Sequence, residues 1–216
     1  MSLFITFEGI EGCGKTTQIS LLCESLRLQG HQVVVTREPG GCAIADAIRQ
    51  ILLDPVHQAM TPKTELLLYA AARAQHVAEV IQPALAQGRI VLCDRYIDAT
   101  LAYQGYGRGL DRALVEDLNQ LATSGCRPDL TLLLDMPAAD GLERAIQRNS
   151  LQNLATEGRF ELEAVAFHDR VRRGYLDLAE KEAQRFRVIE ARGSVAEVAE
   201  RILAVVKTFF ASRKQS

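Results

Sequence analysis

The chain has 216 residues, 48% of them hydrophobic, and its formal net charge is −2. This length and composition are enough to bury a substantial core, and we expect one domain that spans residues 1–216. The near-neutral charge argues against a general basic field of the kind that binds nucleic acid.

The five cysteines are an odd number, lie scattered along the chain and form no C-x-x-C pair. This usage is typical of reduced thiols in a cytosolic protein. The first apolar stretch is broken by Glu8, unlike a signal peptide, and no apolar run reaches membrane-spanning length. We therefore expect a cytoplasmic protein with no membrane partner.

The basic residues divide unevenly into 20 arginines and 5 lysines. Codon bias is the simple explanation of this excess. The alternative is that several arginine side chains bind phosphates through two parallel hydrogen bonds. The two explanations of the arginine excess are compatible.

Short apolar runs typical of strands alternate with longer helical patterns. This alternation predicts an α/β fold with a five-stranded parallel sheet and helices on both of its faces. The predicted strands are Leu3–Phe7, Gln32–Thr36, Ile90–Cys93, Leu130–Leu134 and Phe186–Ile189. The predicted helices are Lys15–Gln29, Ala43–Leu53, Lys63–Gln87, Asp111–Thr123, Ala138–Arg148, Glu161–Ala183 and Val195–Phe210.

The first predicted strand leads into a phosphate-binding loop of the pattern G-x-x-x-x-G-K-[ST], and a helix follows directly. Its glycines let backbone N–H groups turn toward phosphate oxygens, while the helix N-terminus and Lys15 add positive charge. The Thr16 hydroxyl is suited to a Mg²⁺ ion that bridges the outer phosphates. These flanks favour a nucleoside triphosphate site over an accidental glycine-rich turn. The residues expected at this site are Gly9, Ile10, Glu11, Gly12, Cys13, Gly14, Lys15, Thr16 and Thr17.

The second predicted strand is followed by Arg37-Glu38-Pro39-Gly40-Gly41. Proline and two glycines fix a tight turn, for which a cis bond before Pro39 is one route. As structure alone this is an ordinary strand-to-helix turn. With charges at the carboxyl end of a strand, it is also a candidate wall of an acceptor site.

Asp94 and Arg95 follow the third predicted strand. The carboxyl ends of parallel strands point to the ligand crevice, so both side chains should lie beside the phosphate loop. Asp94 is able to hold Mg²⁺, directly or through water, and Arg95 to bind a second phosphate. The alternative for both is a surface ion pair.

Two groups of residues suit a nucleobase. Tyr69 and Arg73 lie four residues apart on one helical face, although a tyrosine on an apolar helix is usually part of the core. Thr100, Tyr103 and Gln104 share a face of a later helical segment. Together they offer an aromatic platform and polar groups for the edge of a base.

The segment Asn149–Gly158 is polar and poorly periodic and lies between two predicted helices. A surface loop is the simple interpretation. In a phosphotransferase, a mobile flap over the phosphates is favoured. We therefore expect a short mobile lid at about residues 148–160.

Taken in order, these motifs closely resemble the thymidylate kinase family over most of the chain. The third of them, Asp94–Gly105, is the most specific. The segments that carry the resemblance are Phe7–Gln18, Thr36–Gly41, Asp94–Gly105, Arg127–Asp135, Phe167-His168 and Gly174–Leu176.

The resemblance implies a P-loop kinase that transfers the γ-phosphoryl group of ATP to dTMP with Mg²⁺ and works as a homodimer. It implies that Tyr69 stacks on thymine and that Arg73, Thr100 and Gln104 contact the base. It also implies that Tyr103 crowds the ribose 2′ position. Arg49 and Arg95 would bind the acceptor phosphate, with Glu11, Glu38 and Asp94 near the sugar and the metal.

The resemblance also bears on the catalytic cation, which some family members place inside the phosphate loop and others supply from the lid. Ile10, Glu11 and Cys13 are not basic, so the lid should supply it here, from Arg148 or Arg159. The family analogy further implies that Arg192 forms a wall of the adenine site. The catalytic residues expected are therefore Lys15, Arg95, Arg148 and Arg159.

Two other functions remain as alternatives. A deoxynucleoside kinase would share the fold, but Arg49 and Arg95 together fit a monophosphate better than an unphosphorylated sugar. A P-loop ATPase acting as a switch would need a residue that places water and a partner surface. The arginine-flanked flap argues instead for excluding water around a second substrate.

Overall fold

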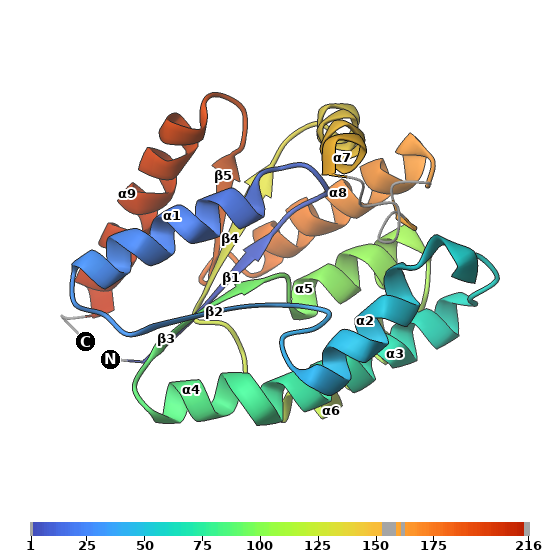
Figure 1. Ribbon diagram of the computed structural model, residues 1–216, viewed down its shortest axis with the longest axis horizontal. Coiled ribbons are helices and arrows are strands. Elements are labelled where there is room, and N and C mark those ends of the chain that lie inside the picture. The colour runs from blue at the N-terminus through green and yellow to red at the C-terminus, as the bar shows by residue number, and fades with distance from the viewer. Residues whose placement is uncertain (1, 153–158, 161–162, 214–216) are drawn as a thin grey trace.

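The computed structural model describes residues 2–152, 159–160 and 163–213, and only the backbone of residues 148–152. Five strands form one parallel sheet in the order β2-β3-β1-β4-β5, as the predicted fold class requires (Figure 1). The strands are β1 (Leu3–Glu8), β2 (Val33–Arg37), β3 (Ile90–Asp94), β4 (Leu130–Asp135) and β5 (Phe186–Glu190).

Every strand extends one residue beyond its predicted end, and that last residue is charged in each case. The charged side chain ends the apolar run in the sequence, but its backbone still pairs within the sheet. At the carboxyl edge four of these side chains are at least partly exposed and only that of Glu8 stays buried, so the sheet presents charged groups along that edge. These strand-terminal residues are Glu8, Arg37, Asp94, Asp135 and Glu190.

Helices cover both faces of the sheet (Figure 1). Helices α1 and α9 pack together on one face, and α4 and α8 contact strands from the other. No helix of the described part is long and apolar enough to cross a membrane. The helices are α1 (Lys15–Leu28), α2 (Ala43–Leu53), η1 (Pro55–His57), α3 (Pro62–His76), η2 (Val77–Ile81), α4 (Gln82–Ala86), α5 (Ile97–Thr100), η3 (Leu101–Gly107), α6 (Arg112–Thr123), α7 (Ala138–Gln152), α8 (Val165–Lys181) and α9 (Val195–Arg213).

The predicted continuous helix Lys63–Gln87 is interrupted. Between α3 and α4 the chain forms the wider π-helical turn η2. Pro83, the second residue of α4, has no N–H to donate to the carbonyl four residues earlier, so the regular α-helical ladder fails there. A second π-helical segment, η3, carries Tyr103 and Gln104.

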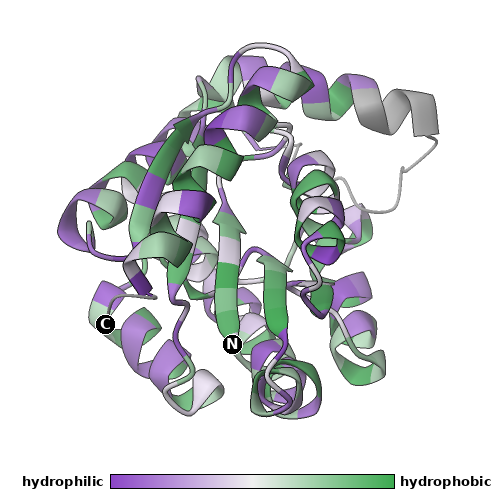
Figure 2. Cartoon of the chain, turned by 90° about the vertical axis from the view of Figure 1, so that its left-hand side faces the viewer, coloured by the Kyte–Doolittle hydropathy of each residue, from purple (hydrophilic) through white to green (hydrophobic). Residues whose placement is uncertain are grey.

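The central strand is buried along its whole length. All six residues of β1 are buried, including Thr6 and Glu8. Thr6 satisfies its hydroxyl through Thr131 Oγ1 at 2.9 Å on the neighbouring strand. Figure 2 shows largely hydrophobic strands inside helices whose outer sides are more hydrophilic.

Helix α8 packs very closely against η3. A Cβ atom on Gly174 would lie 2.6 Å from Cγ of Tyr106, and one on Gly107 would lie 2.7 Å from Cε2 of Phe167. The missing side chains therefore let the two helices approach. This approach brings Phe167 and Tyr175 of α8 against the ring of Tyr103.

Candidate active site

The phosphate loop lies between β1 and α1, as predicted. Gly9, Gly12 and Gly14 all have positive φ angles, which other residues adopt only with strain. Lys15 turns back toward the loop, where its Nζ donates to the carbonyl oxygens of Gly9 at 3.1 Å and Ile10 at 2.9 Å.

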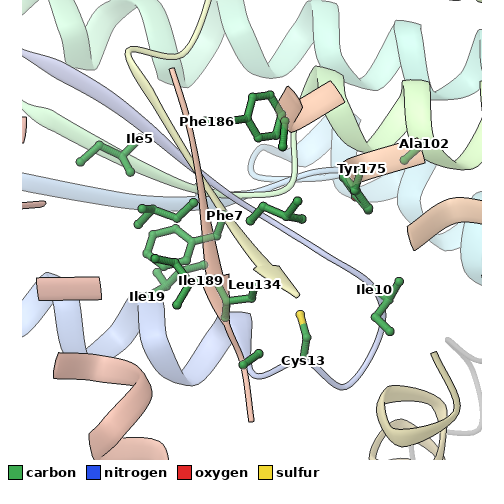
Figure 3. Close-up of a cluster of buried hydrophobic side chains, with 14 of the residues drawn as sticks. Ile5, Phe7, Ile10, Cys13, Ile19, Ala102, Leu134, Tyr175, Phe186 and Ile189 are labelled. Atoms are coloured by element: carbon green, nitrogen blue, oxygen red, sulfur yellow. The ribbon is translucent and has the colours of Figure 1, made fainter. Parts of the chain in front are cut away.

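The side chains of Ile10 and Cys13 do not face the cleft. Both are buried in the core with Phe7, Leu134 and Ile189, as Figure 3 shows at the end of the loop. Their part in any phosphate site is thus limited to the backbone. The apolar side chains instead hold the loop to the sheet.

Helix α7 rests on the same loop. A Cβ atom on Gly12 would lie only 1.9 Å from the carbonyl oxygen of Gly141, and one on Gly141 would lie 2.5 Å from that of Glu11. This backbone contact places α7, and with it Arg144, beside the phosphate loop.

The strand order brings the predicted carboxyl-end residues together. Strand β3 pairs with both β1 and β2, so Asp94 lies level with Phe7 on one side and Arg37 on the other. Thr16 Oγ1 donates to Asp94 Oδ2 at 3.1 Å. A hydroxyl and a carboxylate side by side are hard oxygen ligands, so this pair fits a Mg²⁺ ion whose remaining ligands are phosphates and water.

A cleft of about 580 Å³ opens at this edge of the sheet. Most of the residues predicted for the two substrates line it. These are Glu11, Gly12, Gly14, Lys15, Thr16, Thr17, Glu38, Arg49, Tyr69, Arg73, Asp94, Arg95, Tyr103 and Gln104.

The turn after β2 forms one wall of the cleft. The peptide bond between Glu38 and Pro39 is cis, the route that the sequence left open. Arg49 reaches this turn from α2 and its Nη1 donates to the carbonyl oxygen of Pro39 at 3.0 Å. The guanidinium of Arg49 is thereby fixed at the cleft.

Arg95 occupies a strained backbone position, with a φ angle of 68°. Its N–H donates to the Phe7 carbonyl at 2.9 Å, which ties this turn to β1. The guanidinium lies over the Tyr103 ring at 4.7 Å and donates to Glu11 Oε1 at 3.1 Å. The turn after β3 is therefore joined to the phosphate loop by a charge pair.

Glu11 has several partners besides Arg95. Tyr103 Oη donates to its Oε1 at 2.7 Å, and His168 Nδ1 lies 3.3 Å from its Oε2. Burial would raise the pKa of Glu11, but Arg95, His168 and Tyr103 together hold this pKa well below its ordinary value. Glu11 is thus a fixed negative charge at the cleft.

Glu8 lies deeper, with no exposed surface. Its carboxylate accepts the Tyr96 N–H at 2.7 Å and the Tyr175 hydroxyl at 2.8 Å. Burial, with a contribution from the Asp98 carboxylate, raises the pKa of Glu8 to about 8. Through the Tyr96 N–H, Glu8 supports the strained turn at Arg95.

Arg73 is 1% exposed and heavily bonded. Its Nε donates to Glu38 at 2.7 Å, and its two terminal nitrogens to Asn119 Oδ1 at 2.6 Å and to the Tyr96 carbonyl at 2.9 Å. His76 completes the set, with Nδ1 3.0 Å from Glu38. Arg73 still borders the cleft beside Tyr69, but these bonds hold its position.

Gln104 and Thr100, the other two residues predicted to contact the base, differ in whether they line the cleft. Gln104 lines the cleft, whereas Thr100 is not among its lining residues. Thr100 is 1% exposed, and its hydroxyl has no hydrogen-bond partner among the described residues.

Arg159 lies elsewhere than the predicted position at the transferring phosphoryl group. It is 6% exposed, and its guanidinium donates to the Leu52 carbonyl at 2.6 Å and to Glu65 at 2.5 Å. The buried carboxylate of Glu65 neutralises this guanidinium, and Arg159 is not among the described residues that line the cleft. Residues 153–158 of the predicted lid, and the side chain of Arg148, lie outside the described part.

Arg192 is not among the described residues that line the cleft. Its guanidinium pairs with Asp140 at 3.1 Å. Asp140 precedes Gly141, which touches the loop, so Arg192 stands near the outer side of the phosphate loop.

The sequence interpretation missed some lining residues. Arg144 stands one helical turn before Arg148, and this pair four residues apart was a usable signal. Phe160 packs edge-on against Tyr103 at 5.4 Å, and an aromatic next to Arg159 was a weaker signal. The remaining residues of this kind are Leu53, Tyr96 and Ala99.

Comparisons with known proteins point to a single family. The family model described as thymidylate kinase matches residues 7–202. The thymidylate kinase of Syntrophotalea carbinolica is 65% identical over 202 residues, or 94% of each chain. That of Geobacter sulfurreducens is 61% identical over 95% of this chain and 97% of its own. A crystal structure of thymidylate kinase from Ehrlichia chaffeensis superposes with a TM-score of 0.76 at 37% identity, covering 95% of this chain and 98% of that one.

The buried Glu8 predicts a pH dependence of stability. Its pKa is about 8 in the folded protein, against an ordinary value of 4.5. Between these values the unfolded chain has released the proton and the folded one retains it, so this group makes stability fall as pH rises. Relative to wild type, Glu8→Gln should gain free energy of unfolding from pH 5 to pH 8, by at most about 1.4 kcal/mol per pH unit.

Urea denaturation at several pH values measures this difference. Glu180→Gln, which removes an exposed carboxylate of α8, is the control and should run parallel to wild type. A constant difference between Glu8→Gln and wild type over this range would contradict the raised pKa.

Proposed function

This chain belongs to the thymidylate kinase family, and we propose that the residues of its cleft form a donor side and an acceptor side for the reaction of that family. The reaction transfers the γ-phosphoryl group of ATP to dTMP and yields dTDP and ADP. The observation that carries the assignment is the contact of Thr16 with Asp94, which joins a phosphate loop to a second set of charged and aromatic residues in one cleft.

On the donor side, the N–H groups of residues 9–17 and the N-terminus of α1 bind the phosphates of ATP. Lys15 leaves the loop carbonyls to bind a phosphate oxygen, and Arg192 forms part of the adenine wall. Thr16 and Asp94 would hold Mg²⁺. When bound, its positive charge would offset the negative charge of the phosphates.

On the acceptor side, Arg49 and Arg95 bind the phosphate of dTMP. Both guanidinium groups line the cleft and are held there by other contacts, and their planar fork suits a phosphate. This pair supports a nucleoside monophosphate as acceptor over an unphosphorylated nucleoside.

The base and sugar lie between α3 and η3. Tyr69 stacks on thymine, and Arg73 and Gln104, which also line the cleft, contact its polar edge. Glu11 and Glu38 lie near the sugar. Tyr103, held by Glu11, closes the space that a ribose 2′-hydroxyl would need.

The transfer requires no covalent intermediate, because positioning and charge suffice for an in-line displacement. Lys15 and Arg95 place positive charge beside the phosphoryl group that is transferred. We assign the further catalytic cation, which the sequence analysis placed on the lid, to Arg144 or Arg148 of α7. Arg144 borders the cleft beside the loop, whereas Arg159 is paired with Glu65.

We also propose a homodimer in the cytoplasm. Helices α2, α3 and α6 pack in one layer and leave apolar side chains exposed, of which Leu67 on α3 is 51% exposed. Burial of such side chains against a second copy would remove them from water. All five cysteines are free thiols, which supports a reducing compartment.

The reaction is tested by ADP release with ATP and Mg²⁺ in the presence of dTMP, dUMP, thymidine, AMP or no acceptor. We expect release chiefly with dTMP, accompanied by dTDP. Lys15→Ala should reduce kcat at least about 100-fold, because it removes the positive charge beside the phosphoryl group that is transferred. Release independent of acceptor would instead indicate an ATPase.

The choice of cation is tested by Arg144→Ala, Arg148→Ala and Arg159→Ala. Loss of the transferring cation should lower kcat by up to about 1,000-fold with little change in KM for dTMP. We expect Arg144→Ala or Arg148→Ala to show this pattern. Arg144→Lys keeps the charge and is the matched control. A kcat effect confined to Arg159→Ala would return the role to that residue.

The dimer is tested by sedimentation equilibrium of Leu67→Glu. A charge at this position should shift the protein toward the monomer, because it would have to be buried in the interface. Leu28→Glu changes a residue that is 91% exposed at the end of α1 and should sediment as wild type. Equal masses for all three proteins would exclude this face.

A further inference from the structure

Glu65 is a buried carboxylate to which the sequence gives no role. It lies on α3, one helical turn before Tyr69, and is 1% exposed. Three side chains from other segments donate to it. Gln104 Nε2 lies at 2.8 Å, Arg108 Nη2 at 3.2 Å and Arg159 Nη2 at 2.5 Å.

This cluster is balanced in charge. Arg108 also donates to Glu163 at 2.5 Å, so two carboxylates face two guanidinium groups. Burial would raise the pKa of Glu65, but hydrogen bonds from Arg108 and Gln104 lower it. Glu65 is thus an ionised carboxylate, and its oxygens only accept hydrogen bonds.

An acceptor of this kind decides the orientation of the Gln104 amide. The amide of glutamine has a donor end and an acceptor end that occupy nearly the same volume. Only the nitrogen end is able to face Glu65, because the oxygen end would meet a carboxylate oxygen. The amide oxygen is then the group that Gln104 presents away from Glu65, and Gln104 borders the cleft.

The pyrimidine bases differ at the position that such an oxygen reads. Thymine and uracil carry a hydrogen on N3 and donate there, whereas N3 of cytosine is an unprotonated acceptor. A fixed carbonyl oxygen accepts from the first two and opposes the lone pair of the third. A freely turning amide would accommodate either.

We propose that Glu65 is a positioning residue that fixes the Gln104 amide with its oxygen toward the base, and so makes the acceptor site select pyrimidines that carry an N3–H. This rests on the proposed function, in which Gln104 contacts the base. The same carboxylate holds Arg159, next to Phe160 of the cleft wall, and so joins the selecting residue to that wall.

The decisive variant is Glu65→Gln. The new amide both donates and accepts, so it no longer dictates which end of Gln104 faces it. The ratio of kcat/KM for dTMP to that for dCMP should fall about tenfold, mostly through KM. The ratio of dTMP to dUMP should not change, because both bases carry the N3–H.

Glu163→Gln is the matched control. It removes the other carboxylate bonded to Arg108 but leaves Gln104 and Glu65 in contact. It should keep the dTMP to dCMP ratio of wild type. An equal fall in Glu65→Gln and Glu163→Gln would mean that general loosening of the cluster is the cause, and would overturn the proposal.

Gln104→Leu separates failure of this proposal from failure of the proposed function. If Gln104→Leu leaves the ratio unchanged, Gln104 does not contact the base, and the assignment of the site is wrong. If it lowers the ratio and Glu65→Gln does not, only the role of Glu65 fails. In the double variant, Glu65→Gln should add no further loss to that of Gln104→Leu.

Thermal unfolding without substrate reports whether each variant folds. If Glu65→Gln does not fold, Glu65→Asp replaces it, since it keeps the charge near the two arginines but withdraws the carboxylate from Gln104. It should then lower the same ratio. An unchanged ratio in a folded Glu65→Asp would count against the proposal.

Discussion

The contact between Arg95 and Glu11 fixes the geometry on which the rest of the cleft depends. It joins the turn after β3 to the phosphate loop after β1, across the edge of the sheet. A largely buried ion pair of this kind adds little to stability by itself, since the side chains of Arg95 and Glu11 are only 18% and 12% exposed, but loss of either partner leaves an uncompensated charge. The surrounding groups act on this one pair, since Tyr103 and His168 hold Glu11 while Glu8 supports the backbone next to Arg95.

The arginines of this protein serve the fold as much as the ligand. Arg185 binds Asp98 through two hydrogen bonds of 2.7 and 2.8 Å, and Arg172 binds Asp135 through two of 2.7 and 2.9 Å. The planar guanidinium suits such paired geometry, which lysine is unable to reproduce. Part of the arginine excess is therefore explained by carboxylates of the chain itself, and the phosphate sites account for only some of it.

Local patterns in the sequence were enough to predict the strands, the phosphate loop and the neighbourhood of Thr16 and Asp94, because each depends on a short motif or on the shared carboxyl edge of parallel strands. Long-range pairs were not predictable in this way. Glu65 and Arg159 lie 94 residues apart, and nothing near either one indicates the other. The pairing of Arg159 with Glu65 was therefore not predicted. The interruption of the predicted helix near Pro83 was only partly predictable. The sequence shows that proline lacks an N–H, but it does not show that the chain forms a π-helical turn before it.

The contact between Gly12 and Gly141 limits how this protein could be engineered. Glycine inside a helix costs about 1 kcal/mol relative to alanine, so replacing it is a routine way to raise thermostability. In α7 that route is closed, because the added methyl group would lie 2.5 Å from a carbonyl oxygen of the phosphate loop. A more heat-resistant variant has to be sought at positions other than Gly141, because α7 needs this glycine to lie against the phosphate loop.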